Sequence, residues 1–227
     1  MKKLIMAVIG VLALGVMPAM AQSEDAPARI NKISAFYDLT TLYPKGADNV
    51  YFNGFGVGYN IDFRVSRTMP LYVGTGLNAR FLFNEKEILD DEVYDLVDVE
   101  AHNTFINLNV PLNVSYRVPV ADNFYLTPEV GLDFRLQLYA HSQIDTDIDG
   151  VIGNVAGEFQ EGSRGVNLLS KDQMGDEYLR RFQMGWHAGL NFEYRHVNLG
   201  LTYGTDFVKL HKNLGAGHFL VSLGYTF

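Results

Sequence analysis

The sequence predicts an all-β fold, an eight-stranded antiparallel up-and-down transmembrane β-barrel. Two observations lead to this prediction. Eight segments alternate, residue by residue, between large apolar side chains and small or polar ones, which is the period of a strand with two different faces. The links between these segments are alternately long and short, as in membrane barrels that have short turns at one end and long loops at the other.

Residues 1–21 are predicted to be a cleaved signal peptide. Lys2 and Lys3 form a positively charged start, and Leu4–Val16 is an apolar stretch too short to span a bilayer comfortably. The tripeptide Ala19-Met20-Ala21 then fits a cleavage site. Residues 22–227 are therefore expected to form one barrel domain. A retained N-terminal anchor helix is the alternative, which the length and flanks of the stretch disfavour.

The first four strands are expected before the middle of the chain. Asn31–Thr40 alternates only loosely, whereas Gly54–Ser66 alternates cleanly between large apolar residues and a face of glycine and polar residues. A short link leads to Leu71–Asn84, which repeats the pattern. The acidic stretch Glu85–Ala101 is expected to be a long loop, one of the long links that alternate with short ones. The fourth strand is expected at Asn103–Val118, where apolar residues again occupy every second position.

The last four strands follow the same rule. Phe124–Tyr139 begins after a tight turn, and the longest loop, Ala140–Leu179, separates it from Arg181–Arg195. A short turn joins that strand to Asn198–Asp206. The last strand, His218–Phe227, places its large residues on one face, with His218 expected at the outer rim of the barrel. It must pair with the loosely patterned first strand to close the barrel.

A membrane barrel explains the two faces better than a soluble one. Strands that face water are usually rich in Lys and Glu, but here the polar faces carry Gly, Asn, Ser and Thr, with Arg as the strong base. The apolar faces of the clean strands carry no charge, and aromatic residues gather toward both strand ends, as at two membrane interfaces. With the signal peptide, this predicts the outer membrane of a Gram-negative bacterium, with long loops extracellular and short turns periplasmic. A lipocalin-like soluble barrel is the alternative.

One strand resembles a known family. The segment Val110–Arg117, VPLNVSYR, resembles the "IPL…YR" strand of the Bacteroidetes-type outer-membrane β-barrel domain family, the PorT-like family, and Pro128–Gly131 is similar to its next strand. The layout is also similar to the eight-stranded OmpA and OmpX type. The resemblance implies a barrel in the outer membrane. It implies no particular activity, because the family is functionally diverse.

The inward faces of the strands are predicted to hold a network of charged residues. Eight strands enclose an interior only wide enough for side chains to fill, and unpaired buried charges are costly, so we expect ion pairs rather than a conducting channel. A small pore is the alternative. The expected members are Asp62, Arg64, Arg80, Arg117, Glu129, Asp133, Arg135, His187, Glu193 and Arg195.

The longest loop contains a candidate calcium site. Asp145, Asp147 and Asp149 precede Gly150 in the pattern D-x-D-x-D-G, which begins an EF-hand loop. The bidentate acid expected at position twelve is missing, because Ala156 stands there. A solvated loop or a hairpin with a type I′ turn at Asp149-Gly150 is the favoured interpretation. Apart from this calcium ion, no cofactor is expected.

The composition of the chain narrows the range of expected binding partners. The formal net charge of −8 excludes the basic surface that nucleic-acid binding requires. The absence of Cys excludes disulfides and a lipoprotein anchor. Expected partners are outer-membrane lipid, lipopolysaccharide, the barrel-assembly machinery, which would bind the C-terminal strand ending in Phe227, and a protein that contacts the acidic loops. Simple solubility of those loops is the plainer interpretation of their charge.

The expected function is that of a structural or interaction protein, in adhesion or envelope assembly, with acidic extracellular loops as the contact surface. A small porin or a secretion-accessory barrel is the alternative. A lipid-modifying enzyme is less favoured, because the lipid-facing positions offer only the hydroxyls of Thr75 and Thr205 and no Ser or His. The chain also lacks the G-x-S-x-G and H-E-x-x-H motifs.

Overall fold

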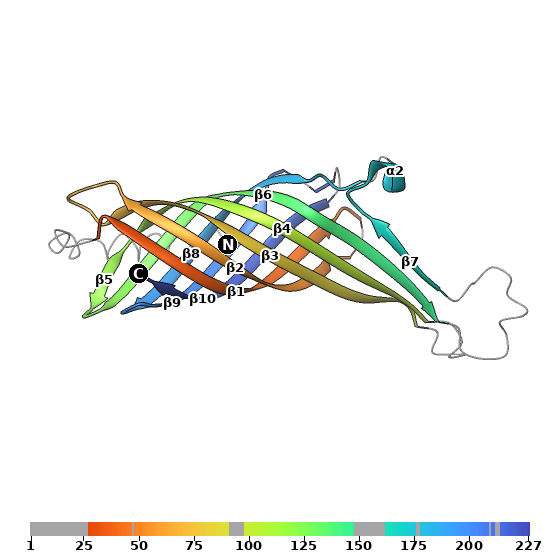
Figure 1. Cartoon of the computed structure of the whole chain (residues 1–227), viewed down its shortest axis with the longest axis horizontal. Coiled ribbons are helices and arrows are strands. Elements are labelled where there is room, and N and C mark those ends of the chain that lie inside the picture. The colour runs from red at the N-terminus through yellow and green to blue at the C-terminus, as the bar shows by residue number, and fades with distance from the viewer. Residues whose placement is uncertain are drawn as a thin grey trace, which may run out of the picture.

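Eight long antiparallel strands close into a barrel in the computed structural model (Figure 1). The structure describes residues 27–46, 48–90, 98–147, 162–175, 178–208, 210–211 and 214–227, so the predicted signal peptide lies outside the described residues. The barrel strands are β1 (Arg29–Pro44), β2 (Val50–Arg64), β3 (Leu71–Asp90), β4 (Asp98–Tyr116), β6 (Phe124–Asp147), β8 (Phe182–Tyr194), β9 (Val197–Asp206) and β10 (Leu214–Thr226).

Two pairings close the ring and confirm the predicted topology. β1 pairs with β10 from Lys32–Thr226 to Pro44–Leu214, and β4 pairs with β6. The loosely patterned first strand is therefore the seam partner of the last strand, as the sequence predicts. It is longer than expected, because its hydrogen bonds to β2 and β10 continue beyond Thr40.

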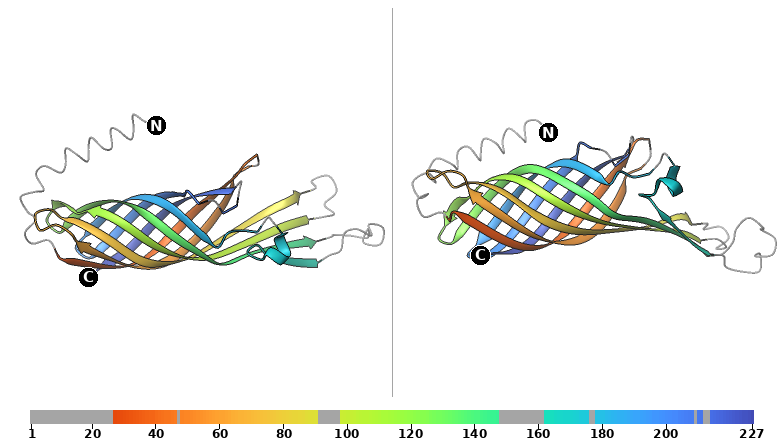
Figure 2. Two further views of the ribbon diagram at one scale, coloured as in Figure 1. Left: turned by 90° about the horizontal axis from the view of Figure 1, so that it is seen from above. Right: turned by 45° about the horizontal axis from the view of Figure 1, so that its top comes forward.

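The two ends of the barrel differ. We call the end with Pro27, Phe227 and the short turns the turn end, and the opposite end the loop end (Figures 1 and 2). The short strand β5 (Val118–Ala121) pairs with β6 at the turn end. At the loop end, β7 (Gly162–Asn167) pairs with β6 and is followed by the single-turn helix α2 (Lys171–Met174). None of the helices in the described ranges is long and apolar enough to cross a membrane.

Parts of the acidic stretches predicted to be loops are strand, namely 85–90, 98–101, 140–147 and 162–167, which corrects the expected boundaries. β3 and β4 pair as far as Asp90–Asp98, and β4 and β6 as far as Asp98–Asp147. Their backbone groups are satisfied across the sheet, and this pairing outweighs the low strand propensity of Asp and Glu. Together with β7, these strands project beyond the rim of the barrel (Figures 1 and 2). We call this extension the projection.

The expected faces of the strands are confirmed. On β2, Val57 is 59% exposed, and on β10, Leu223 is 61% exposed, so these apolar side chains point away from the barrel. The residues that alternate with such apolar side chains point inward. Asp62 on β2 is an example, and it is buried. An apolar outer band of this kind is what lipid contact requires.

The loop end of the interior is apolar, which the sequence pattern did not predict. Inward side chains at the loop ends of the strands form a core with residues from the connecting segments. We call this cluster the apolar cap, and its members are Leu42, Phe52, Leu82, Phe105, Ala140, Leu169, Leu179, Leu210 and Ala216. Phe52 and Phe105 pack with their ring centroids 4.9 Å apart. The backbone of the connecting segment is tied down as well, since Leu168 N–H donates to Ala140 O at 2.9 Å.

Candidate functional site

The polar interior between the apolar cap and the turn end is the candidate functional site. Because side chains alternate along each strand, inward residues from all around the barrel converge there. Near the cap, Arg80 on β3 binds Asp38 on β1, with Arg80 Nε 2.6 Å from Asp38 Oδ2. Thr40 Oγ1 donates to the other oxygen of Asp38 at 2.9 Å. Asp38 is fully buried, so its charge is balanced inside the protein.

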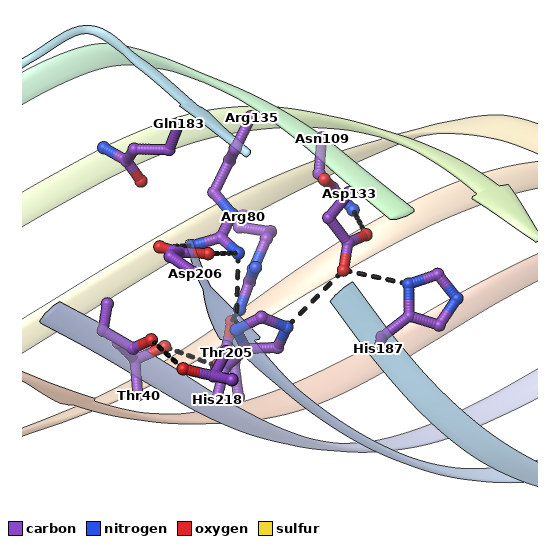
Figure 3. A network of polar contacts seen from close by, with 12 residues as sticks. Thr40, Arg80, Asn109, Asp133, Arg135, Gln183, His187, Thr205, Asp206 and His218 are labelled. Atoms are coloured by element: carbon purple, nitrogen blue, oxygen red, sulfur yellow. Dashed lines mark hydrogen bonds and ion pairs between the residues drawn. The ribbon is translucent and has the colours of Figure 1, made fainter. Parts of the chain in front are cut away.

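A second group surrounds Asp133 (Figure 3). Asn109 Nδ2 donates to Asp133 Oδ1 at 2.8 Å, and His187 Nδ1 lies 2.9 Å from Asp133 Oδ2. His218 Nε2 lies 3.7 Å from the same oxygen. Arg135 links this group to Asp206 through two contacts of 3.0 and 3.2 Å. These residues come from five different strands, β4, β6, β8, β9 and β10, so the network fixes these strands relative to one another.

A third group lies toward the turn end. Lys32 Nζ on β1 is 2.7 Å from Asp62 Oδ2 on β2, and Arg117 Nη2 is 2.7 Å from Glu193 Oε1 on β8. The Arg117 guanidinium also stacks on the Tyr125 ring, 3.4 Å from its centroid. Charged pairs in a low-dielectric interior are favourable only when geometry and hydrogen bonding are good. Both pairs are in close contact, but Arg117 Nε has no hydrogen-bond partner among the described residues.

Most of the predicted interior residues do meet inside the barrel. Two do not. Arg195 is exposed and has a positive φ of 56°, because β8 ends at Tyr194 and the turn to β9 consists of Arg195 and His196. Arg64 ends β2, and its Nη2 donates to the carbonyl oxygen of Arg67 in the adjoining turn at 2.9 Å. Arg195 thus lies in a turn, with its guanidinium over the Tyr194 ring, and Arg64 is hydrogen-bonded to the turn that follows β2.

Among the described acids, bases and histidines of the interior network, sequence analysis missed Lys32, Asp38, Asp206 and His218. The alternation of β1 could have identified the first two, since they occupy the positions between its apolar residues. His218 was expected at the rim, and this is wrong. β10 begins at Leu214, so His218 lies inside the barrel, 3% exposed, within 3.3 Å of Arg135 Nη2.

Two hollows lie along the interior. A cavity of about 120 Å³ is lined by Lys32, Asp62, Glu129, Asp133 and His187, among others. A larger hollow of about 520 Å³ lies at the turn end, where Arg117 and Glu193 form part of its wall. The apolar cap covers the loop end. The arrangement can therefore hold water or small polar solutes inside the barrel, with the wider opening at the turn end.

The candidate calcium residues are only partly described. Asp145 and Asp147 belong to β6, opposite Glu100 and Asp98 on β4, whereas Asp149 and the expected Asp149-Gly150 turn lie outside the described residues. Among the residues that the structure describes, no three His, Asp or Glu side chains converge as a metal site. The calcium site stays a prediction.

The solved structures that resemble this chain include three small outer-membrane barrels. The attachment invasion locus protein Ail of Yersinia pestis, solved with the heparin analogue sucrose octasulfate, is 15% identical, with a TM-score of 0.43 and coverage of 88% of this chain and 100% of that one. Neisserial surface protein A is 10% identical, with a TM-score of 0.41 and coverage of 87% and 97%. OprG of Pseudomonas aeruginosa is 10% identical, with a TM-score of 0.37 and coverage of 89% and 97%.

Comparison with curated proteins gives no match. A family model, in contrast, covers nearly the whole chain, including every described strand. It matches residues 9–227 and describes the outer membrane protein β-barrel domain. The closed eight-stranded ring and the apolar outer face agree with that description, and the chain therefore belongs to the outer membrane β-barrel domain family.

Proposed function

We propose that this outer-membrane protein of a Gram-negative bacterium is a structural and interaction barrel, which acts in adhesion or envelope assembly through its acidic projection. The observation that supports this most directly is the length of the loop-end strands. β2 pairs with β3 only as far as Asn53–Phe83, whereas β3 and β4 continue together to Asp90–Asp98. A paired sheet that extends past the barrel wall is a stable platform for a partner.

The strand register concentrates negative charge in this projection. Glu100 on β4 is paired with Glu87 on β3 and with Asp145 on β6. Two residues further along β4, Asp98 is likewise paired with Asp90 on β3 and with Asp147 on β6. Like charges at directly opposed positions destabilise a sheet, and a divalent cation or a basic partner would offset that cost. Calcium bridging to lipopolysaccharide, with Asp145, Asp147 and Asp149 among the ligands, or a basic protein surface fits this charge.

The interior supports a packed rather than a conducting barrel. The apolar cap seals the loop end, and the paired charges described above occupy the space below it. We therefore propose that the resting protein passes no steady ion current. Planar-bilayer recordings of the refolded protein distinguish this role from the alternative, a small porin or secretion-accessory barrel, since steady channels without a partner would support the alternative.

Contacts on the lipid side also disfavour catalysis. Thr75 Oγ1 donates to Pro111 O at 2.9 Å, and Thr205 Oγ1 donates to Ala216 O at 3.0 Å. Each hydroxyl is thus engaged with a backbone carbonyl rather than with a base that could activate it. We propose that the protein is not an enzyme, and unchanged lipid A and phospholipid profiles in a deletion strain are the expected result.

The C-terminal strand is the proposed contact with the barrel-assembly machinery. Phe227 is 60% exposed, and its backbone N–H donates to Asn31 O at 3.0 Å across the seam. The aromatic ring of Phe227 is therefore accessible to the assembly machinery at the turn end, while its backbone belongs to the seam between β1 and β10. A deletion of Phe227 is expected to slow membrane assembly in cells more than it lowers the stability of the refolded barrel.

The experiment that tests the main proposal shortens the projection without touching the barrel. Glu85 and His102 are paired on β3 and β4, so residues 86–101 can be replaced by Asn-Gly, which favours a two-residue hairpin turn. Binding of cells to lipopolysaccharide vesicles, with and without calcium, and cross-linking to envelope proteins are then compared with wild type. The shortened protein should lose both calcium-dependent binding and specific cross-links while keeping its heat-modifiable gel shift.

A charge variant distinguishes the effect of the projection's negative charge from the effect of its shape. Changing Glu85, Glu87 and Glu100 to Gln together should weaken binding and reduce its calcium dependence. The matched control neutralises three exposed acids away from the projection, Asp48, Asp122 and Asp172, and should bind like wild type. Equal binding by wild type and both projection variants would overturn the proposal.

A further inference from the structure

Two arginines at the rim of the turn end take no part in the interior ion pairs. Arg29 begins β1, and Arg195 lies in the turn between β8 and β9. Both side chains are exposed, and neither forms an ion pair with the described residues. Arg117, which lies inside the same end of the barrel, is bound to Glu193 instead. The charges of the two rim arginines are therefore available to a partner outside the barrel.

Neighbouring side chains hold the Arg29 guanidinium at the outer surface. Its Nε donates to Asn31 Oδ1 at 2.9 Å, and the Tyr59 hydroxyl donates to the same oxygen at 3.1 Å. Its Cζ lies 6.0 Å from the centroid of the Phe63 ring, which is 48% exposed on the outer face of β2. The two terminal nitrogens of Arg29 have no hydrogen-bond partner among the described residues, so their N–H groups can donate to a ligand.

Arg195 has a similar arrangement on the other side of the C-terminal strand. Its Cζ lies 5.4 Å from the centroid of the Tyr194 ring, which is also exposed. Backbone hydrogen bonds join the end of β10 to the β8–β9 turn on one side and to β1 on the other. Only β10 therefore separates the two arginines across the sheet, about 10 Å between backbones at the usual strand spacing. Both also border the hollow of about 520 Å³ at the turn end, so they face a common space.

The aromatic rings beneath these arginines mark the level of the lipid headgroups. Tyr225 and Phe227 stack beside the seam with their ring centroids 6.4 Å apart, and both are exposed on the outer face. Aromatic residues at the ends of barrel strands lie at the membrane interface. A long basic side chain at this level packs its stem on apolar groups and places its charge among the headgroups. Arg29 and Arg195 are therefore positioned to meet lipid phosphates.

The exposed charges at the turn end favour an anion. Besides the two rim arginines, the exposed charged side chains in the described turns of this end are Arg67 and Asp122, so three bases face one acid. A terminal carboxylate on Phe227 would offset one further base and still leave the rim positive. Each basic residue near an anionic lipid surface strengthens the attraction to it. The rim therefore suits a lipid with a net negative charge.

We propose that Arg29 and Arg195 form a binding site for the headgroup phosphate of an anionic phospholipid, in the leaflet at the turn end. With the short turns on the periplasmic side, as the sequence predicts, this is the inner leaflet. The phosphate oxygens accept from the guanidinium nitrogens, a geometry for which arginine is well suited, and an acyl chain lies over the ring of Phe227. A choline or ethanolamine group would bring a positive charge to the arginines, so zwitterionic lipids bind less well. The site lies at the opposite end from the acidic projection and does not depend on the function proposed for it.

Lipid retention by the refolded mature protein tests this proposal. The barrel is equilibrated in nonionic detergent with equal amounts of phosphatidylglycerol and phosphatidylcholine, and native mass spectrometry counts the lipids that stay bound. Wild type should retain phosphatidylglycerol over phosphatidylcholine by roughly fivefold or more at low salt. The double variant Arg29→Gln, Arg195→Gln should retain the two lipids almost equally. A tenfold excess of inorganic phosphate should leave the bound phosphatidylglycerol in place, because the lipid also contacts the aromatic rings.

A matched control removes the same formal charge elsewhere. Arg164→Gln, Lys171→Gln changes two exposed bases on β7 and α2 at the loop end and should keep the wild-type preference. Wild type alone gives a second readout, since the preference should fall as sodium chloride screens the charges. The proposal is overturned if wild type shows no preference, if the preference is insensitive to salt, or if the rim variant retains it. Displacement by inorganic phosphate would also overturn it, since the site would then bind a free anion rather than a lipid.

Discussion

Arg80 on β3 and Asp38 on β1 bind each other across β2, the strand that lies between them. The register pairs Asp38 with Gly54 and Arg80 with Gly56, so β2 presents glycines at the crossing point. Arg80 is 2% and Asp38 0% exposed. The ion pair therefore joins two strands that share no backbone hydrogen bond and forms a floor beneath the apolar cap.

Removing one partner of this pair should be strongly destabilising. Asp38→Ala leaves the Arg80 guanidinium buried without its counter-ion, and breaking a buried pair in this way costs about 3–5 kcal/mol. The double variant Asp38→Leu, Arg80→Met should recover much of that loss because no charge is left unpaired. Urea unfolding in lipid vesicles measures both. A single variant as stable as wild type would show that water already reaches Arg80.

A matched control uses the exposed pair of Glu85 and His102, whose nitrogen and oxygen are 3.6 Å apart. Glu85 is 78% exposed by its side chain. Exposed pairs contribute about 0–1 kcal/mol, so Glu85→Gln should change the unfolding free energy little. The contrast isolates burial as the cause of the Asp38 effect.

The glycine at the crossing point should be needed for its missing side chain. A Cβ at Gly56 would overlap the Phe36 ring and the Ala79 carbonyl oxygen. Gly56→Ala should therefore cost about 1–3 kcal/mol, as overpacking does. Gly215→Ala is the control, since nothing lies within 4 Å of a Cβ there, and it should be neutral or slightly stabilising. Thermal unfolding of both variants in the same detergent gives the comparison.

The alternation of side chains made most of the barrel predictable. A period of two fixes which residues face lipid, so the outward positions of β2 and β10 and the inward positions of Arg80, Asp133 and Glu193 follow directly from the sequence. Lys32 and Asp38 obey the same rule, but the loose pattern of β1 concealed them. The boundary of a strand is harder to predict than its faces. For this reason Arg195 was expected in a strand but lies in a turn, and His218 was expected at the rim but lies in the interior.

Long-range pairing explains what the sequence could not provide. The stretch Glu85–Ala101 has loop-like composition, yet residues 85–90 pair with 98–102, and 98–101 pair on their other side with β6. Only the register reveals this. The apolar cap likewise combines strand residues such as Phe52 with Leu169 and Leu210 from connecting segments. No local pattern marks residues in a connection that fold back into the barrel mouth.

A charged substitution on the outer face of the barrel should be destabilising. Val57 lies in the middle of β2 and is 59% exposed, so Val57→Arg would place a guanidinium in the lipid at a cost of about 2–4 kcal/mol if it lies near the midplane. Val57→Leu keeps the side chain apolar and should be nearly neutral. Refolding equilibria in phospholipid vesicles measure the difference. If Val57 faced water instead of lipid, the Arg substitution would cost much less stability. A small loss would therefore argue against lipid contact at this position.

The apolar cap should control access of water to the interior from the loop end. Leu169 and Leu179 are buried in it at 7% and 8% exposure, and Thr40 lies just beneath it on β1, at 5% exposure. The chain has no Cys, so Thr40→Cys introduces a single thiol that a charged, water-soluble reagent added on the loop side can report.

With the cap intact, this thiol should react slowly, because labelling requires a local opening. Adding Leu169→Ser and Leu179→Ser removes apolar contacts and should speed the reaction by roughly tenfold or more, since protection follows the free energy of opening. A thiol at position 172, on the exposed helix α2, should label equally fast with or without the two serines. If the Thr40→Cys thiol reacts at the same rate in both backgrounds, water reaches the interior by another route and the cap does not close the barrel.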